Sequence, residues 1–286
     1  MTHDLELRYS RLLHLYPSEY RRARGAEILD TLLSSAEEGR AHPAPRELFA
    51  LVLGALRVRA GRGSHRSVRQ SWLAACRAAA LMLLVYAVAD TTMHLAITLA
   101  YRIRPAALIL AALAVALYAM IAALRGRYRT AGLFAAVAFL VALAEIPNLI
   151  HFWQLPLAVV LLVPLMKLRP PPVVGLLRYA PVVPVLLVVI EQGLAQLLPD
   201  IAGILRFGAF LGLAVGGLIW LAVDERVAMA LGLLLLNGAL IQLVFIPMEL
   251  PLQNIPAALA SVAVAASVPV VLLLASAGAA RRHARL

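Results

Sequence analysis

The sequence predicts an all-α fold, in which a polytopic membrane bundle of about eight transmembrane helices follows a small three-helix cytoplasmic domain. Hydrophobic residues make up 63% of the 286 positions and charged residues 14%, and the mean hydropathy is +0.87. Soluble domains average about 45–50% apolar and about 25% charged residues, so this composition is typical of a chain that lies in lipid. The first 70 residues differ, because they hold 12 of the 26 Lys and Arg and 8 of the 15 Asp and Glu. We therefore expect a charged head (1–70), a transmembrane bundle (71–278) and a basic cytoplasmic tail (279–286).

Three amphipathic helices are predicted in the head. Pro17 separates the first two, with Thr2 and Ser18 as their expected N-caps, and a connector over 42–45 precedes the third. The apolar positions recur at helical spacing and form one face on each helix: Leu5, Tyr9, Leu12, Leu13 and Tyr16; then Tyr20, Ile28, Leu29, Leu32 and Leu33; then Leu48, Leu51, Val52, Ala55 and Leu56. Three such faces are enough to close a small core.

A resemblance appears over residues 8–33, RYSRLLHLYPSEYRRARGAEILDTLL. This run resembles the amino-terminal segment of a group of actinobacterial multi-pass membrane proteins, including the helical prefix of some permease domains and the head of membrane proteins encoded beside PadR-type repressors. The matching positions are Arg11, Leu12, Leu13, Leu15, Tyr16, Pro17, Tyr20, Arg21, Arg22, Gly25, Glu27, Ile28 and Leu29. The relatives usually read Gly-Glu-Glu-Met where this chain has Gly-Ala-Glu-Ile. The resemblance implies membrane regulation or transport and assigns no catalytic residue.

The head has two interpretations. As a docking module it would contact a soluble partner through Tyr16, Tyr20, Arg21 and Arg22. As an anchoring cap it would only assist assembly or orientation.

Eight apolar runs follow the head, most of them with the roughly 20 residues that a bilayer requires. They span 72–100, 105–123, 130–149, 152–167, 180–198, 201–222, 227–246 and 255–278. The fourth run is short and contains Pro156 and Pro164.

The positive charges between these runs predict the orientation. With the head in the cytoplasm, the inner segments carry ten Lys and Arg, and the outer segments carry two. This excess fits the positive-inside rule and places both termini in the cytoplasm. The inner residues are Arg125, Arg127, Arg129, Lys167, Arg169, Arg178, Arg226, Arg281, Arg282 and Arg285, and the outer residues are Arg102 and Arg104.

A weak internal repeat suggests two four-helix halves, 72–167 and 180–278. In both 146–156 and 246–256, seven residues separate an Ile-Pro pair from an aliphatic residue followed by Pro. Halves with an even number of spans share one orientation, which makes this a parallel repeat of the kind found in some transporters.

Carboxylates recur at the predicted outer ends of the odd-numbered spans. Asp90 and His94 lie four residues apart, and therefore on one helix face, in the outer half of the first span. Glu145 lies at the outer end of the third span, and Glu191 lies in the outer half of the fifth. Ionisable groups within a membrane usually face the bundle interior. These four residues are our candidate ligand site, an extracytoplasmic pocket for a cation or a cationic small molecule. The alternative is that they are interfacial groups bonded to neighbouring helices.

The sequence contains no motif for catalysis or nucleotide binding, so we expect a non-enzymatic protein without a cofactor. It has no HExxH, GxSxG or Walker sequence, and its only cysteine, Cys76, excludes a disulfide or a cysteine metal site within one chain. The pI of about 10.8 is explained by the inner loops, so no nucleic-acid partner is predicted. The expected partners are the lipid bilayer and a soluble cytoplasmic regulator. The alternatives are a small transporter or permease subunit, working with an ATPase subunit, and a membrane-bound anti-sigma-like protein.

Overall fold

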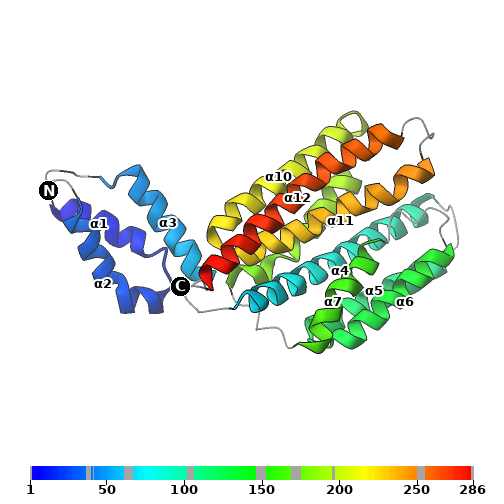
Figure 1. The fold of residues 1–286 in the computed structure, drawn as a ribbon, viewed down its shortest axis with the longest axis horizontal. Coiled ribbons are helices and arrows are strands. Elements are labelled where there is room, and N and C mark those ends of the chain that lie inside the picture. The colour runs from blue at the N-terminus through cyan, green and yellow to red at the C-terminus, as the bar shows by residue number, and fades with distance from the viewer. Residues whose placement is uncertain are drawn as a thin grey trace. The chain divides into compact units, whose positions relative to one another are not determined.

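The computed structural model describes residues 2–36, 40, 42–60, 67–101, 106–145, 153–168, 175–194, 197–249 and 255–284. Helices account for all the regular secondary structure in these ranges (Figure 1). The chain forms two compact units. The first comprises Met1–His65, Val174–Leu176 and Ala222–Asp224, and the second comprises the remaining residues.

The amino-terminal part of the first unit consists of helices α1 (Thr2–Leu13), α2 (Ser18–Ser34) and α3 (Pro45–Arg59). Helix α1 packs against both of the others. Because its apolar residues are four apart, they lie on one stripe and together enter the core. The buried members of this core are Leu5, Tyr9, Leu13, Tyr16, Leu51 and Ala55.

Two details of the sequence prediction for these helices are wrong. Ser18 is the first residue of α2 rather than its cap, because Pro17 takes the cap position and no side chain bonds to the helix end there. Val52 is 41% exposed instead of buried, since the core stripe of α3 runs through Leu51 and Ala55. Thus Val52 and the neighbouring Phe49, which is 69% exposed, leave an apolar surface on α3.

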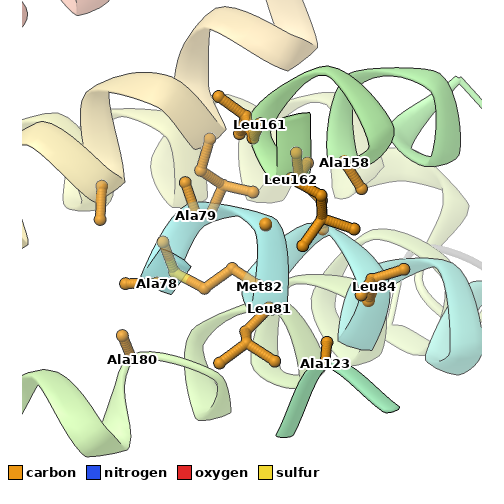
Figure 2. Packing of buried hydrophobic residues seen from close by; sticks show 14 of the residues in the cluster. Ala78, Ala79, Leu81, Met82, Leu84, Ala123, Ala158, Leu161, Leu162 and Ala180 are labelled. Carbon is orange, nitrogen blue, oxygen red and sulfur yellow. The ribbon is translucent and has the colours of Figure 1, made fainter. Parts of the chain in front are cut away.

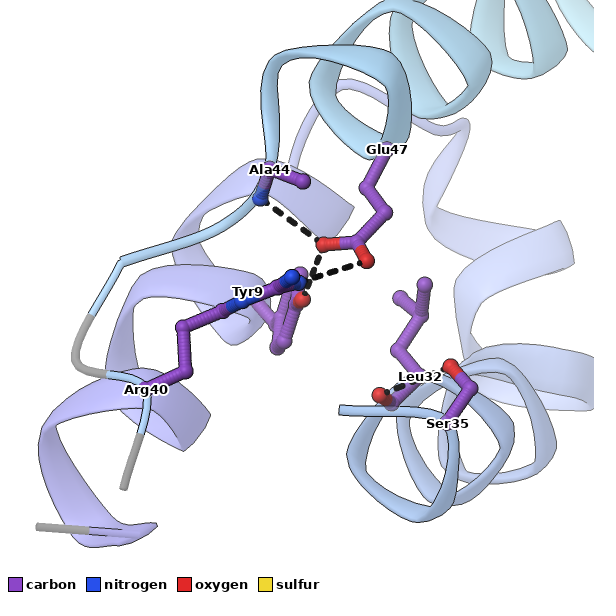
Figure 3. A network of polar contacts seen from close by, with 6 residues as sticks. All are labelled: Tyr9, Leu32, Ser35, Arg40, Ala44 and Glu47. Atoms are coloured by element: carbon purple, nitrogen blue, oxygen red, sulfur yellow. Dashed lines mark hydrogen bonds and ion pairs between the residues drawn. The ribbon is translucent and has the colours of Figure 1, made fainter. Parts of the chain in front are cut away.

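A polar network around Glu47 joins α1 to the start of α3 (Figure 3). Tyr9 has no exposed surface, and its hydroxyl donates to Glu47 Oε2 at 2.6 Å. The same oxygen accepts from the backbone N–H of Ala44 at 2.8 Å, and Arg40 pairs with Oε1 at 3.0 Å. The carboxylate therefore satisfies a buried hydroxyl and an otherwise unpaired N–H at the helix start.

This network predicts that the head is most stable between the ordinary pKa values of glutamate and tyrosine. The hydrogen bonds from Tyr9 and Ala44, and then the charge of Arg40, lower the pKa of Glu47 below 4.5. Stability from Glu47 is therefore present above pH 4.5 and is lost as pH falls through its folded pKa. Burial, and then the bond to Glu47, raises the pKa of Tyr9 from 10.0 to about 12. Stability from Tyr9 is present below pH 10.0 and is lost as pH rises towards about 12.

Urea unfolding of the head within the full chain, followed across this range, checks both limits. The Tyr9→Phe variant is the control, because it cannot ionise at position 9 and should lose the alkaline limb. A midpoint that is flat from acid to alkali would contradict the prediction.

The first four helices of the second unit form a ring. They are α4 (Val68–Tyr101), α5 (Ala107–Leu124), α6 (Tyr128–Glu145) and α7 (Gln154–Lys167). Each helix packs against the next, and α7 returns to α4 (Figure 1). The turn between α5 and α6 is tight and contains Gly126 at φ +75°, a conformation that favours glycine.

Alanine fills much of the ring interior around α4 (Figure 2). Small residues allow helix backbones to approach closely, which membrane bundles use in place of a hydrophobic driving force. Leucines and Met82 from α4 and α7 occupy the spaces between them. The alanines of α4 with at most 3% exposure are Ala74, Ala75, Ala78, Ala79, Ala80 and Ala87.

The remaining helices are arranged differently around α4. They are α8 (Val182–Val188), the π-helical turn η3 (Val189–Leu194), α10 (Ala202–Val223), α11 (Glu225–Glu249) and α12 (Ile255–His283), with short 3₁₀ turns at Gly175–Tyr179 and Pro199–Ile201. Helix α11 packs along α12 and against α4, and α8 also packs against α4. The two groups of helices therefore differ in their pairing. The segments 146–156 and 246–256 that suggested a repeat lie largely outside the described residues, and duplication stays a prediction.

Gly217 is a close-contact position of α10. A Cβ atom added there would lie 2.6 Å from Cδ2 of Leu272 on α12, whereas one added at the adjacent Gly216 would meet nothing within 4 Å. The glycine-rich sequence 212–217 thus includes one packing glycine beside open ones.

Five described helices are long and apolar enough to cross a membrane, namely α4, α5, α10, α11 and α12. Helices α6 and α7 are apolar but shorter over their described residues, and the fifth predicted run is divided between α8 and η3. Helix α12 continues to His283, so most of the predicted tail, 279–286, is helical.

Candidate ligand site in the helix bundle

Asp90 is a buried carboxylate on the ring side of α4. Its side chain is 2% exposed, and Oδ2 accepts a long hydrogen bond of 3.4 Å from Nε2 of Gln154 on α7. Gln154 is itself 1% exposed. His94 follows one helical turn later and is half-buried. Asp90 therefore links two helices of the ring, as the interfacial interpretation of the sequence expects.

Glu191 lies in the π-helical turn η3 and also bonds to α4. The Tyr86 hydroxyl donates to Glu191 Oε2 at 2.5 Å. A π-helical turn inserts one residue into the helix and often occurs at functional sites. Among the described groups, the other carboxylate oxygen, Oε1, accepts no hydrogen bond.

The Glu191 carboxylate lines a cavity of about 110 Å³ between α4, α8, α10 and α11. Its polar lining comes from Tyr86, Glu191 and Asn237. Its apolar lining consists of Leu187, Phe210, Leu213, Leu234, Leu235 and Ile241, with Gly238 completing the wall. No Lys or Arg is among the described residues that line it.

Asn237 is the second polar group of this cavity. It is 6% exposed, and its amide hydrogen-bonds to no group in the described part of the chain. Buried amides are normally hydrogen-bonded, so the Asn237 amide is a polar group available to whatever occupies the cavity. Nothing in the position of Asn237 along the sequence reveals a cavity.

Of the four predicted pocket residues, Glu191 is the one found among the described lining of this cavity. Asp90 and His94 are absent from the described lining of the Glu191 cavity, and Asp90 bonds to α7 instead. Glu145 ends α6, but its side chain lies outside what the structure describes. The cavity instead joins Glu191 to Tyr86 and Asn237, which the sequence analysis did not select.

In the head, the predicted partner residues divide between core and surface. Tyr16 is 8% exposed, and its ring stacks on Tyr20 at a centroid distance of 5.4 Å. Arg21 bonds to Nδ1 of His14 at 2.8 Å. Arg22 is exposed. Tyr16 is therefore a core residue, and Arg22 is the exposed member of the set.

An open depression of about 380 Å³ lies at the turn between α5 and α6, and its lining includes the basic residues Arg127 and Arg129.

Arg226, which the sequence analysis placed between two predicted spans, is 2% exposed and lies on the first turn of α11. The neighbouring Glu225 accepts from the Ser71 hydroxyl of α4 at 3.4 Å.

No protein-family model, curated protein or solved structure matches this chain. Within the described ranges, no three His, Cys, Asp or Glu side chains gather in a group that would hold a metal ion. The site is therefore interpreted from its own chemistry.

Proposed function

We propose that the protein is a non-enzymatic membrane protein of the regulatory, sensory or accessory class, with eight spans in the cell membrane and both termini in the cytoplasm. Five long apolar helices and the shorter apolar helices α6 and α7 support a multi-span bundle. In the proposal, α8 together with η3 forms the remaining span. The ratio of ten inner to two outer basic residues supports the orientation. The resemblance of residues 8–33 to actinobacterial membrane proteins points to the same class.

The observation that carries this proposal is the exposed apolar surface of α3, held on a small folded core. Phe49 and Val52 are large apolar side chains that are 69% and 41% exposed, and the exposed Arg46 and Arg59 lie on the same helix. An aromatic anchor beside arginines is typical of protein-binding surfaces. The matching partner is a soluble regulator that presents an acidic, apolar surface.

A photocrosslinking amino acid at position 49, in native membranes, tests this function. We expect it to capture a specific soluble protein, whereas the same probe at the exposed Glu19 of α2 does not. The Arg46→Glu variant should weaken binding of that purified protein about tenfold, because it reverses one charge of the surface. The matched Arg8→Glu variant on α1 should leave binding unchanged. Crosslinks to lipid alone, or equal loss in both variants, would contradict the proposal.

The Glu191 cavity favours a second function, that of a small transporter or permease subunit that takes a cationic substrate. A carboxylate that lines a cavity in an apolar bundle beside a buried amide has the chemistry of a substrate site. Energy would come from a gradient or from a separate ATPase subunit.

A further inference from the structure

We infer that the cavity between α4, α8, α10 and α11 binds a small alkylammonium ion, with its charged nitrogen at Glu191 and Asn237 and its hydrocarbon body against the leucines. This inference names the class of substrate for the proposed transporter function. The binding of the ion does not depend on that function, but its movement across the membrane does. Binding itself is separable from movement across the membrane.

The sign of the ligand charge follows from Glu191. Among the described groups, its carboxylate accepts one hydrogen bond, from the Tyr86 hydroxyl, and no described Lys or Arg lines the cavity. A carboxylate away from water is stabilised by a cation and destabilises an anion. Anionic ligands are therefore excluded, and a cation satisfies the site.

The small number of oxygen atoms in the cavity favours an ammonium group over a metal ion as the ligand. The described lining offers three kinds of oxygen, from Glu191, Asn237 and Tyr86. A primary ammonium has three N–H donors and no acceptor, which fits a few fixed oxygens. Calcium takes six to eight oxygen ligands and magnesium six. The remaining wall is hydrocarbon, and bare metal ions gain nothing from it.

The volume and the apolar wall define the body of the ligand. An apolar cavity of about 150 Å³ holds benzene, so this smaller space suits about four to six non-hydrogen atoms. Six of the lining side chains are aliphatic or aromatic, and they come from α8, α10 and α11. A short alkyl chain buried there gains about 0.8 kcal/mol per methylene group. The class is thus a short primary alkylamine in its protonated form.

Equilibrium binding of n-butylammonium to the full chain in lipid nanodiscs tests the inference, with empty nanodiscs as background. We expect saturable binding, and no comparable binding of n-butanol, which has the same hydrocarbon body without the charge. In Glu191→Gln the affinity should fall about thirtyfold or more, because the charge partner is removed while the shape is kept. Asn237→Leu should weaken binding about tenfold.

The matched control is Asp200→Asn, which removes an exposed carboxylate from the chain segment that follows η3. It should bind like the unchanged protein. Equal affinity for butanol, unchanged affinity in Glu191→Gln, or displacement by equimolar sodium would each overturn the site. Tyr86→Phe provides a second variant if Glu191→Gln does not fold, and it too should weaken binding. Binding without uptake into vesicles would retain the site and refute the transporter function.

Discussion

Replacing Glu47 with alanine should lower the free energy of unfolding of the head by about 2–4 kcal/mol. The change leaves the fully buried Tyr9 hydroxyl without its acceptor. It also removes the oxygen that accepts from the Ala44 N–H and the partner of Arg40. Three interactions therefore end with one side chain. Hydrogen exchange of the α1 amides in the full chain measures the loss.

Two variants isolate the cause. Glu19→Ala, which removes an exposed acid from α2, should change exchange little. Adding Tyr9→Phe to Glu47→Ala should restore part of the stability, because no buried hydroxyl is then unsatisfied. If the double variant is as unstable as the sum of the single variants, the buried hydrogen bond does not explain the effect.

Isoleucine at Gly217 should destabilise the bundle by about 1–3 kcal/mol or more, since it adds a branched side chain where a single Cβ already meets Leu272. Leu272 is 1% exposed and is surrounded by the core, so it has little room to move. We expect α10 and α12 to separate and the purified protein to aggregate at a lower temperature. Heating in detergent, followed by size-exclusion chromatography, measures this change.

The adjacent Gly216 provides the matched control. Its Cβ position is open, so Gly216→Ile keeps the same composition and the same helix while adding no contact. It should retain the original aggregation temperature. Equal damage from both substitutions would mean that isoleucine disturbs α10 itself, and would contradict the packing explanation.

The apolar runs predicted helical segments in the bundle, because an apolar run of sufficient length has few alternatives to a helix in lipid. The start of α4 at Val68 and the end of α5 at Leu124 lie close to the predicted spans. The predictions fail in two situations. In one, a small rotation of a helix decides which side chains are buried; in the other, one extra residue is inserted into a helical turn. Val52 turned outward by such a rotation, and the π-helical turn at Glu191 has no signature in hydropathy.

The candidate site was only partly predictable for a related reason. Their positions along the predicted spans place Asp90 and Glu191 at comparable depths in the membrane. This depth does not predict which neighbouring helix each side chain faces. Packing decides that Asp90 meets Gln154 and that Glu191 meets Tyr86. Asn237 lies far along the chain from both carboxylates. Helix α11 packs against α4, and this packing brings Asn237 into the lining of the same cavity as Glu191.

The buried alanines of α4 have a consequence for inherited variation. A single-base change in an alanine codon gives valine, threonine, serine, proline, aspartate, glutamate or glycine, and only glycine is smaller. At fully enclosed positions such as Ala79 and Ala80, almost every such missense change therefore enlarges the side chain. Natural variants at these positions should therefore damage the helix packing by steric overlap rather than by leaving a cavity. Few substitutions should be tolerated there.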